Sequence, residues 1–260
     1  MKSDYKIGFV LSGGGARGIS HLGVVKALAE MGIKPDIISG TSSGAILGAF
    51  LAGGFSPDRI MEFIKEQKIM SSLRLAMSRA GLFKMDNAIK LYAKYLGHDT
   101  FEKLNIPLIV SATDLITGKT VYFSKGELFT PVMASAAIPI IFKPVNYEGM
   151  ILVDGGLLNN LPAEPLQDRC DYVIGVHSNP IGRVEKIGNF RRVMERTFLF
   201  SVNNTIKTRI ELCDLFIEPV ELTRFRVFDV SKSDVIFKIG YDAVYKMKNE
   251  IDHFKKHADL

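Results

Sequence analysis

Short apolar runs that end in glycine-rich turns and continue into helices constrain the fold of this chain more than any other feature. The first run covers residues 6–11, and a helical pattern over 19–30 follows its glycine turn. Gly32 and Pro35 stand where this helix should end, and a second apolar run covers 36–39. Such strand–helix–strand units build parallel sheets with right-handed crossovers. The pattern therefore predicts an α/β fold.

The rest of the chain continues this alternation. Further strands are expected at residues 107–112, 120–123, 150–153, 172–176 and 215–218. Helices are expected near residues 128–137, 191–212 and 236–256. Strands that alternate with helices predict a three-layer α/β/α sandwich with a mainly parallel central sheet. With no internal repeat or low-complexity linker, the 260 residues are expected to form one domain, 1–260.

Composition and hydropathy exclude several other classes of protein. Hydrophobic residues make up 47% of the chain and charged residues 23%, which excludes a disordered chain. The longest apolar stretch, residues 45–55, is too short to cross a bilayer, and the N-terminus lacks the pattern of a secretion signal. Cys170 and Cys213 have no metal-binding spacing and are expected to be reduced and buried. We expect a cytoplasmic protein with no metal site.

Positive charge is concentrated in one segment of the chain. The net charge is +5, and residues 59–95 hold eight Lys or Arg against three acids, which equals the whole excess. Bulky apolar side chains lie between these cations at roughly helical spacing. Two interpretations stay open: a lid that contacts an anionic membrane at its periphery, or a helical hairpin whose apolar side packs on the core. This interleaving favours a membrane rather than nucleic acid as a partner.

A glycine-rich loop follows the first strand, where a helix begins. Its consecutive backbone amides can hold an anion, and three kinds of site use such a loop. A nucleotide-binding P-loop is disfavoured because Ile19 stands where its lysine would be. A dinucleotide site is disfavoured because Asp36 lies at the start of the second strand rather than at its end. The third kind is an oxyanion hole, whose candidate residues are Gly13, Gly14, Gly15, Arg17 and Gly18.

The second strand runs into a GxSxG sequence, which is typical of a nucleophile elbow. Its glycines allow a turn sharp enough to expose Ser42, and the helix that follows presents its positive end to a developing oxyanion. Because the carboxyl ends of parallel strands meet at one edge of a sheet, this turn and the glycine loop should lie together. The elbow comprises Gly40, Thr41, Ser42, Ser43 and Gly44.

A serine nucleophile needs a base, and the residues leave two candidates. His177 follows an apolar strand and would complete a triad with Ser42 and Asp154. Asp154 follows another apolar strand, in an Asp-Gly sequence that also occurs in ordinary turns. His21 is expected to be exposed or to cap the first helix, and Asp114 is expected to be a structural turn acid.

Taken together, these segments resemble the patatin-like phospholipase family, in which a glycine-rich oxyanion loop, a GxSxG elbow and a DG[GA] sequence mark a serine–aspartate dyad. The three motifs lie here at residues 13–18, 40–44 and 154–156. The likeness covers most of the chain and is greatest to the short bacterial-type members. It also runs through residues 111–115, 134–139 and 157–162.

The resemblance implies a role for each motif. Ser42 corresponds to the nucleophile and Asp154 to the base. The oxyanion amides correspond to the loop around Gly14 and Gly15, and Arg17 matches the basic position of that loop. The third motif is completed by Gly155 and Gly156.

The resemblance also implies a serine acyl-hydrolase, of the phospholipase A, lipase or esterase type, that forms an acyl-enzyme on a lipid or ester substrate without a metal or organic cofactor. Burial should raise the pKa of Asp154 and so make it a better base for serine. Two alternatives remain. One is an esterase with a Ser42–Asp154–His177 triad, and the other is a non-catalytic protein that binds lipid or regulates a partner.

Overall fold

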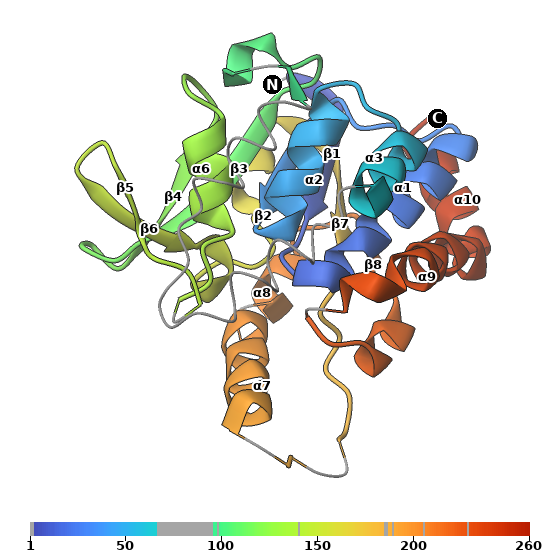
Figure 1. The fold of residues 1–260 in the computed structure, drawn as a ribbon. Helices are drawn as coiled ribbons and strands as arrows, with labels where there is room; N and C mark the ends of the chain where they lie inside the picture. The colour runs from blue at the N-terminus through green and yellow to red at the C-terminus, as the bar shows by residue number, and fades with distance from the viewer. Residues whose placement is uncertain are drawn as a thin grey trace.

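An eight-stranded β-sheet lies at the centre of the fold (Figure 1). The computed structural model of the chain describes residues 3–66, 96–97, 99–139, 141–184, 187–188, 190–204, 206–227 and 229–260. The strands are β1 (Tyr5–Leu11), β2 (Ile37–Thr41), β3 (Leu108–Asp114), β4 (Lys119–Phe123), β5 (Val145–Tyr147), β6 (Met150–Asp154), β7 (Cys170–Val176) and β8 (Leu215–Ile217). Their order is β5-β6-β3-β2-β1-β7-β8, and β4 pairs with β3.

Strands β3, β2, β1, β7 and β8 run parallel to one another, whereas β4, β5 and β6 form antiparallel pairs beside β3. The predicted α/β class, with a mainly parallel central sheet flanked by helices, is confirmed. Strand β5 was not predicted, because three residues are too few to show an alternating pattern.

Helices and short 3₁₀ turns connect the strands. The α-helices of the described ranges are α1 (Ser20–Glu30), α2 (Ser43–Ala52), α3 (Pro57–Glu66), α6 (Phe129–Ser135), α7 (Phe190–Asn203), α8 (Ile206–Ile210), α9 (Ser233–Lys246) and α10 (Lys248–His257). The 3₁₀ turns are η1 (Gly15–Ile19), η2 (Phe101–Lys103), η3 (Gly155–Leu157), η4 (Glu164–Leu166), η5 (Val220–Arg224) and η6 (Val230–Lys232). The helix predicted over 191–212 is found as α7 and α8.

The two faces of the sheet carry separate layers of core because successive side chains of a strand point to opposite faces. Phe9 and Leu11 of β1 belong to a cluster that includes buried side chains of α1, α2 and α9. Val10 belongs to a second cluster, with Leu166 of η4 and Ile206 of α8. Helices therefore cover one face, and short turns with α8 cover the other.

The C-terminal part of the chain packs against α1 (Figure 1). A Cβ atom at Gly240 of α9 would lie 2.0 Å from the backbone oxygen of Ser20, so the two helices are in close backbone contact. The prediction of one continuous helix over 236–256 is wrong, because α9 ends before Met247 and α10 begins after it. The break brings Phe254 of α10 against Tyr172 of β7, with ring centroids 5.6 Å apart.

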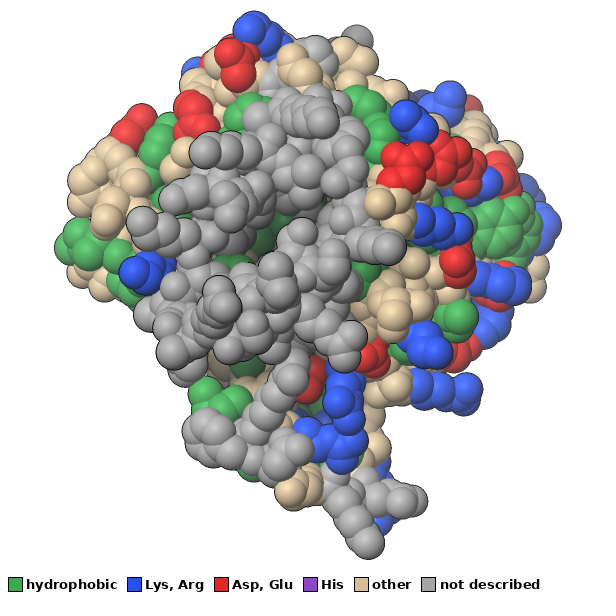
Figure 2. All heavy atoms as spheres, viewed as in Figure 1, with side chains coloured by type: hydrophobic (Ala, Val, Ile, Leu, Met, Phe, Trp, Pro, Cys, Tyr) green, Lys and Arg blue, Asp and Glu red, His purple; other side chains and the backbone are tan. Residues whose placement is uncertain are grey.

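Charged side chains of both signs are intermingled over α9 and α10 (Figure 2). Lysines pair with aspartates one turn further along each helix, and these pairs are Lys238–Asp242 and Lys248–Asp252. Exposed pairs of this kind contribute little to stability. This surface therefore has the character of an ordinary solvated face.

Helix α3 contains the first part of the basic segment 59–95. Its apolar side chains Ile60, Met61 and Phe63 are buried in the core, which agrees with the core-packing interpretation at the start of the segment. Its cations are paired, Arg59 with a glutamate of the same helix and Lys65 with an aspartate of α9. Residues 67–95 lie outside the described residues, and a membrane-contacting lid there stays a prediction. None of the described helices has the length and hydropathy that crossing a bilayer requires.

Candidate active site

Two strands meet end to end along one edge of β3. Strand β4 occupies one edge of β3 throughout Val110–Asp114, so the other strands that pair with this part of β3 lie along its opposite edge. On that edge Ser111 pairs with Thr41, the last residue of β2, and the next residue, Ala112, pairs with Asp154, the last residue of β6. Because β6 is antiparallel to β3, it approaches β2 head-on. The ends of the two strands therefore meet, although they are far apart in the sequence.

Ser42 lies in a sharp turn between β2 and α2. Its φ of 53° is in the left-handed region that a side chain rarely adopts, and its backbone N–H donates to Ser135 Oγ at 2.8 Å. A Cβ atom at Gly40 would lie 2.7 Å from the backbone of Gly44. A Cβ atom at Gly44 would lie 2.1 Å from the carbonyl oxygen of Leu11. Both glycines are therefore needed for the close approach of α2 to the strands.

The Ser42 hydroxyl is in contact with the Asp154 carboxylate. Ser42 Oγ donates to Asp154 Oδ2 at 2.7 Å, and the backbone N–H of Gly156 donates to Asp154 Oδ1 at 2.7 Å. Both side chains are buried. Burial raises the pKa of Asp154 to about 6, although the hydrogen bonds from Ser42 and Gly156 act in the opposite direction. Asp154 is thus ionised at neutral pH and is more basic than an ordinary aspartate.

The glycine loop passes directly beside this pair. A Cβ atom at Gly13 would lie 3.0 Å from the Cβ of Ser42, and one at Gly18 would lie 2.3 Å from Ser43 Oγ. Across the described ranges, the backbone N–H groups of Gly14 and Gly15 have no hydrogen-bond acceptor. Backbone amides on a loop beside a nucleophile, without an acceptor among the described residues, are the groups that an oxyanion hole requires.

Buried polar side chains hold the loop in this position. The carbonyl oxygen of Gly13 accepts hydrogen bonds from Ser178 Oγ at 3.0 Å and from Asn179 Nδ2 at 2.7 Å. On another side of the loop, Ala16 N–H donates to the carbonyl oxygen of Val227 at 2.7 Å. The loop is therefore fixed by contacts with two segments that lie far along the chain.

Arg17 is directed toward the segment that contains Val227. Its side chain is buried, and Nε and Nη2 donate to the carbonyl oxygen of Phe225 at 2.8 and 2.5 Å. Neither Ser42 nor Asp154 is among its hydrogen-bond partners. Arg17 therefore braces the loop rather than contacting the serine.

His177 is fully buried, with its ring 6.1 Å from the ring centroid of Phe216. Its Nδ1 pairs with Glu218 Oε1 at 2.6 Å. None of the hydrogen bonds of the described residues joins His177 to Ser42 or Asp154. The structure brings Asp154, and not His177, to the serine hydroxyl.

The expectation that His21 is exposed or caps a helix is wrong. Its side chain is fully buried, and Nε2 lies 2.8 Å from the carbonyl oxygen of Ser12. Burial lowers the pKa of His21 to about 4, so the ring is neutral and donates through Nε2. The cause is η1, a turn that precedes α1 and places His21 beneath the glycine loop.

Other sequence expectations concern structural positions. Asp114 accepts hydrogen bonds from Thr117 Oγ1 at 2.7 Å and from the Ile116 N–H at 3.1 Å, which confirms a turn acid. Cys170 is buried, whereas Cys213 is only half-buried, and neither forms a disulfide. No three His, Cys, Asp or Glu side chains of the described ranges cluster as a metal site requires. The role of Ser135 was not predicted, since nothing in the surrounding sequence marks its hydroxyl as the acceptor for a backbone N–H.

Comparison with known proteins identifies the family. The sequence profile of the patatin-like phospholipases matches residues 9–166, which is more than half of the chain and includes all three motifs. The chain belongs to the patatin-like phospholipase family.

The patatin-like chain has both bacterial and human relatives. An uncharacterized NTE family protein of Mycobacterium bovis is 35% identical over 184 residues, which cover 68% of this chain and 50% of that protein. Patatin-like phospholipase domain-containing protein 6 of Homo sapiens is 27% identical over 271 residues, which cover 90% of this chain and 20% of that protein. The patatin-like chain thus spans half or less of the length of these relatives.

Among solved structures, VipD from Legionella pneumophila has a similar fold. The TM-score is 0.54 at 17% sequence identity, over 95% of this chain and 67% of that chain. At this identity the similarity shows the patatin-like fold alone.

Proposed function

We propose that this patatin-like chain is a lipid acyl hydrolase that cleaves carboxylic esters with a Ser42–Asp154 dyad. Family membership supports the class of substrate and reaction. The observation that carries the proposal is the 2.7 Å hydrogen bond from Ser42 Oγ to Asp154 Oδ2, between two buried side chains. A hydroxyl that donates to an ionised carboxylate is oriented for loss of its proton during attack.

The reaction proceeds in two halves. Ser42 Oγ attacks the acyl carbon while its proton passes to Asp154, and the C–O bond to the alcohol breaks as the alcohol takes up that proton. Water then attacks the acyl-serine, gives a proton to Asp154 and releases the fatty acid, and Ser42 regains its proton. The carboxylate is the only proton acceptor that the cycle needs.

The oxyanion of each tetrahedral intermediate lies within reach of the glycine loop in this proposal. The free amides of Gly14 and Gly15 donate to it, and α2 adds the positive end of its dipole. Loss of one such donor typically raises the barrier by about 2.7–4 kcal/mol. A dyad without a strong general acid suits alkoxide leaving groups, which favours esters over amides.

The test combines an active-site label with ester turnover. A fluorophosphonate probe should label the wild-type chain and the control Ser231→Ala, whose serine is exposed, but not Ser42→Ala. Asp154→Asn should lower kcat by about 10²–10⁴-fold on a panel of acyl esters and short-chain phospholipids. Circular dichroism checks that each variant is folded.

Three outcomes would contradict this assignment. Labelling that persists in Ser42→Ala would exclude Ser42 as the nucleophile. Full turnover in Asp154→Asn, together with its loss in folded His177→Gln, would indicate a different base. A wild-type chain that binds lipid but neither reacts with the label nor cleaves any ester would be a non-catalytic lipid-binding protein.

A further inference from the structure

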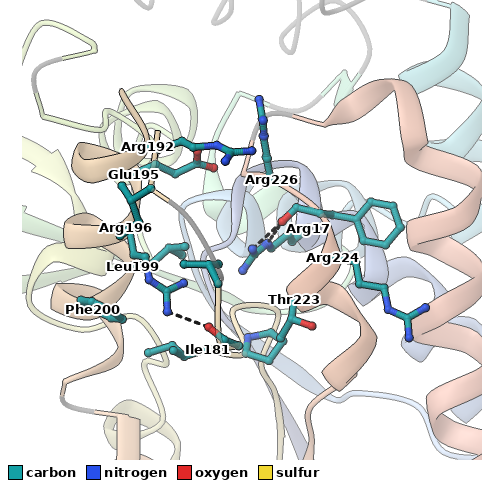
Figure 3. A pocket seen from close by; sticks show the side chains of 15 residues that line it. Arg17, Ile181, Arg192, Glu195, Arg196, Leu199, Phe200, Thr223, Arg224 and Arg226 are labelled. Carbon is teal, nitrogen blue, oxygen red and sulfur yellow. Dashed lines mark hydrogen bonds between the residues drawn. The ribbon is translucent and has the colours of Figure 1, made fainter. Parts of the chain in front are cut away.

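A cavity of about 450 Å³ lies between α7 and the segment 223–226, next to the glycine loop (Figure 3). Neither Ser42 nor Asp154 is among the residues that line it. Arg17, which lies on the glycine loop, is one of the residues that line the cavity. The cavity is therefore separate from the dyad but shares one wall with the loop that passes beside it.

Positive charge dominates the lining. The cations are Arg17, Arg192, Arg196, Arg224 and Arg226. Glu195 is the one acid among the lining residues, and its Oε1 already accepts a hydrogen bond from Val227 N–H at 3.0 Å. Arg196 donates to the carbonyl oxygen of Gly182 at 2.8 Å, which holds its guanidinium at the wall. The lining of this cavity is therefore rich in guanidinium groups.

Arg17 provides the observation that points to a ligand. Its side chain is only 5% exposed, yet Nη1 has no hydrogen-bond partner among the described residues. A buried donor without a hydrogen-bond partner is destabilising, and more so when the group is charged. In Figure 3 the Arg17 guanidinium faces the space on the α7 side, toward which Arg192 also extends. An anion in this space would accept the unused N–H.

Apolar side chains form the rest of the wall. Ile181, Leu199 and Phe200 line the cavity on the side of α7 and the segment that precedes it. A volume of about 450 Å³ is within the range of small-molecule sites. A site with guanidinium groups at one part of the wall and aliphatic and aromatic side chains at another suits a ligand that is anionic at one end and apolar at the other.

We propose that this cavity binds the phosphate group of an amphiphilic ligand, with Arg17 and Arg192 at the phosphate and Leu199 at the apolar portion. Arginine suits this role because its planar fork of N–H groups matches phosphate oxygens. Binding requires no hydrolysis, so the proposal stands or fails independently of the dyad. Since Arg17 lies on the glycine loop, an occupied site would also hold that loop in place.

The test measures binding by titration calorimetry in the Ser42→Ala variant of the full chain, so that no probe is cleaved. The probes are dihexanoyl phosphatidic acid, dihexanoylglycerol and inorganic phosphate, each as a monomer in solution. Phosphatidic acid should bind at least tenfold more tightly than dihexanoylglycerol, and its affinity should fall as salt rises. Inorganic phosphate that binds as tightly as phosphatidic acid would identify a small phosphate compound, rather than a lipid headgroup, as the ligand.

Arginine variants locate the site. Arg192→Gln should weaken phosphatidic acid binding about five- to tenfold, and Arg17→Gln should weaken it further. Lys207→Gln is the matched control, because this exposed cation of α8 does not line the cavity, and it should change the affinity less than twofold. Thermal unfolding shows whether Arg17→Gln remains folded, and Arg192, which is exposed, keeps the test valid if it does not. Equal affinity for the two lipids, no binding of either phosphate probe, or equal effects of Arg192→Gln and Lys207→Gln would overturn the proposal.

Discussion

Asp154 carries two hydrogen bonds that favour its ionised form, from Ser42 and from Gly156, yet its pKa is raised to about 6 because burial has the larger effect. A base with a pKa near 6 accepts a proton more readily than an aspartate with a pKa of 3.8. It also remains ionised at neutral pH. The environment of this one residue therefore meets both requirements of a general base.

The pH dependence of ester turnover follows from this pKa. Only the ionised carboxylate can accept the serine proton, so kcat/KM should be level above pH 6 and fall about tenfold per pH unit below it. Initial rates between pH 4 and 8 measure the profile, and thermal unfolding at each pH separates loss of activity from loss of fold. Activity that stays level down to pH 4 would contradict Asp154 as the base.

The residue roles were only partly predictable from the sequence. The GxSxG sequence pointed to Ser42, because its spacing encodes a local turn. The choice between Asp154 and His177 remained open on the residues alone, since it depends on which strand ends beside β2. The resemblance to a family pointed to Asp154. The burial of His21 was missed because the turn η1, which places it under the loop, leaves no periodic signal in five residues.

At the scale of secondary structure, the site depends on how closely α2 approaches β1. The helix begins immediately after Ser42, and Gly44 in its first turn touches the carbonyl of Leu11. The two strands near this contact were predicted to within two residues, and a helix was expected after the GxSxG turn. The direction of β6 was not predicted, because the apolar pattern of a strand is the same whether it pairs parallel or antiparallel.

Gly44→Ala should separate α2 from β1. The new Cβ would lie 2.1 Å from a backbone oxygen, which cannot move aside as a side chain can. We expect a loss of about 3 kcal/mol of unfolding free energy and at least a hundredfold loss of ester turnover. Thermal unfolding and initial rates measure the two effects.

Gly48→Ala is the matched control in the same helix. Its Cβ would lie 3.2 Å from side-chain atoms of Ile38 and Leu108, which can shift. Alanine also favours a helix over glycine by about 1 kcal/mol, so stability should change little and turnover should be retained. Equal losses in the two variants would show that the Leu11 contact is not the cause.

At the scale of the whole molecule, the C-terminal helices complete the layer that supports the glycine loop. Helix α9 packs on α1, and α1 begins directly after η1, which contains Arg17 and Gly18. The fold class and the alternation of strands and helices along the chain were predictable because most of the longer elements have their own periodic pattern, whereas β5 is too short to show one. The break at Met247 was not predictable, because no glycine or proline marks it in the sequence. It is accompanied by the packing of Phe254 on Tyr172, which is a tertiary contact.

Gly240→Ala tests this long-range support. A Cβ at Gly240 would lie 2.0 Å from the carbonyl oxygen of Ser20, so α9 must move away from the start of α1. We expect a loss of about 2–4 kcal/mol of unfolding free energy, measured by denaturant titration. Gly188→Ala is the control, because a Cβ there would meet no atom of the described residues within 4 Å. An unchanged midpoint in Gly240→Ala would show that the two helices are not tightly coupled.

The buried carboxylate beside Ser42 also couples folding to proton uptake. With a pKa of 3.8 when exposed and about 6 in the fold, Asp154 gains a proton when the chain folds between these pH values. The stabilisation from its protonated form is complete below pH 3.8 and is lost as the pH rises through 6, a difference of about 3 kcal/mol. As far as this group is concerned, the folded chain is therefore least stable in the pH range in which Asp154 is ionised and can accept the serine proton.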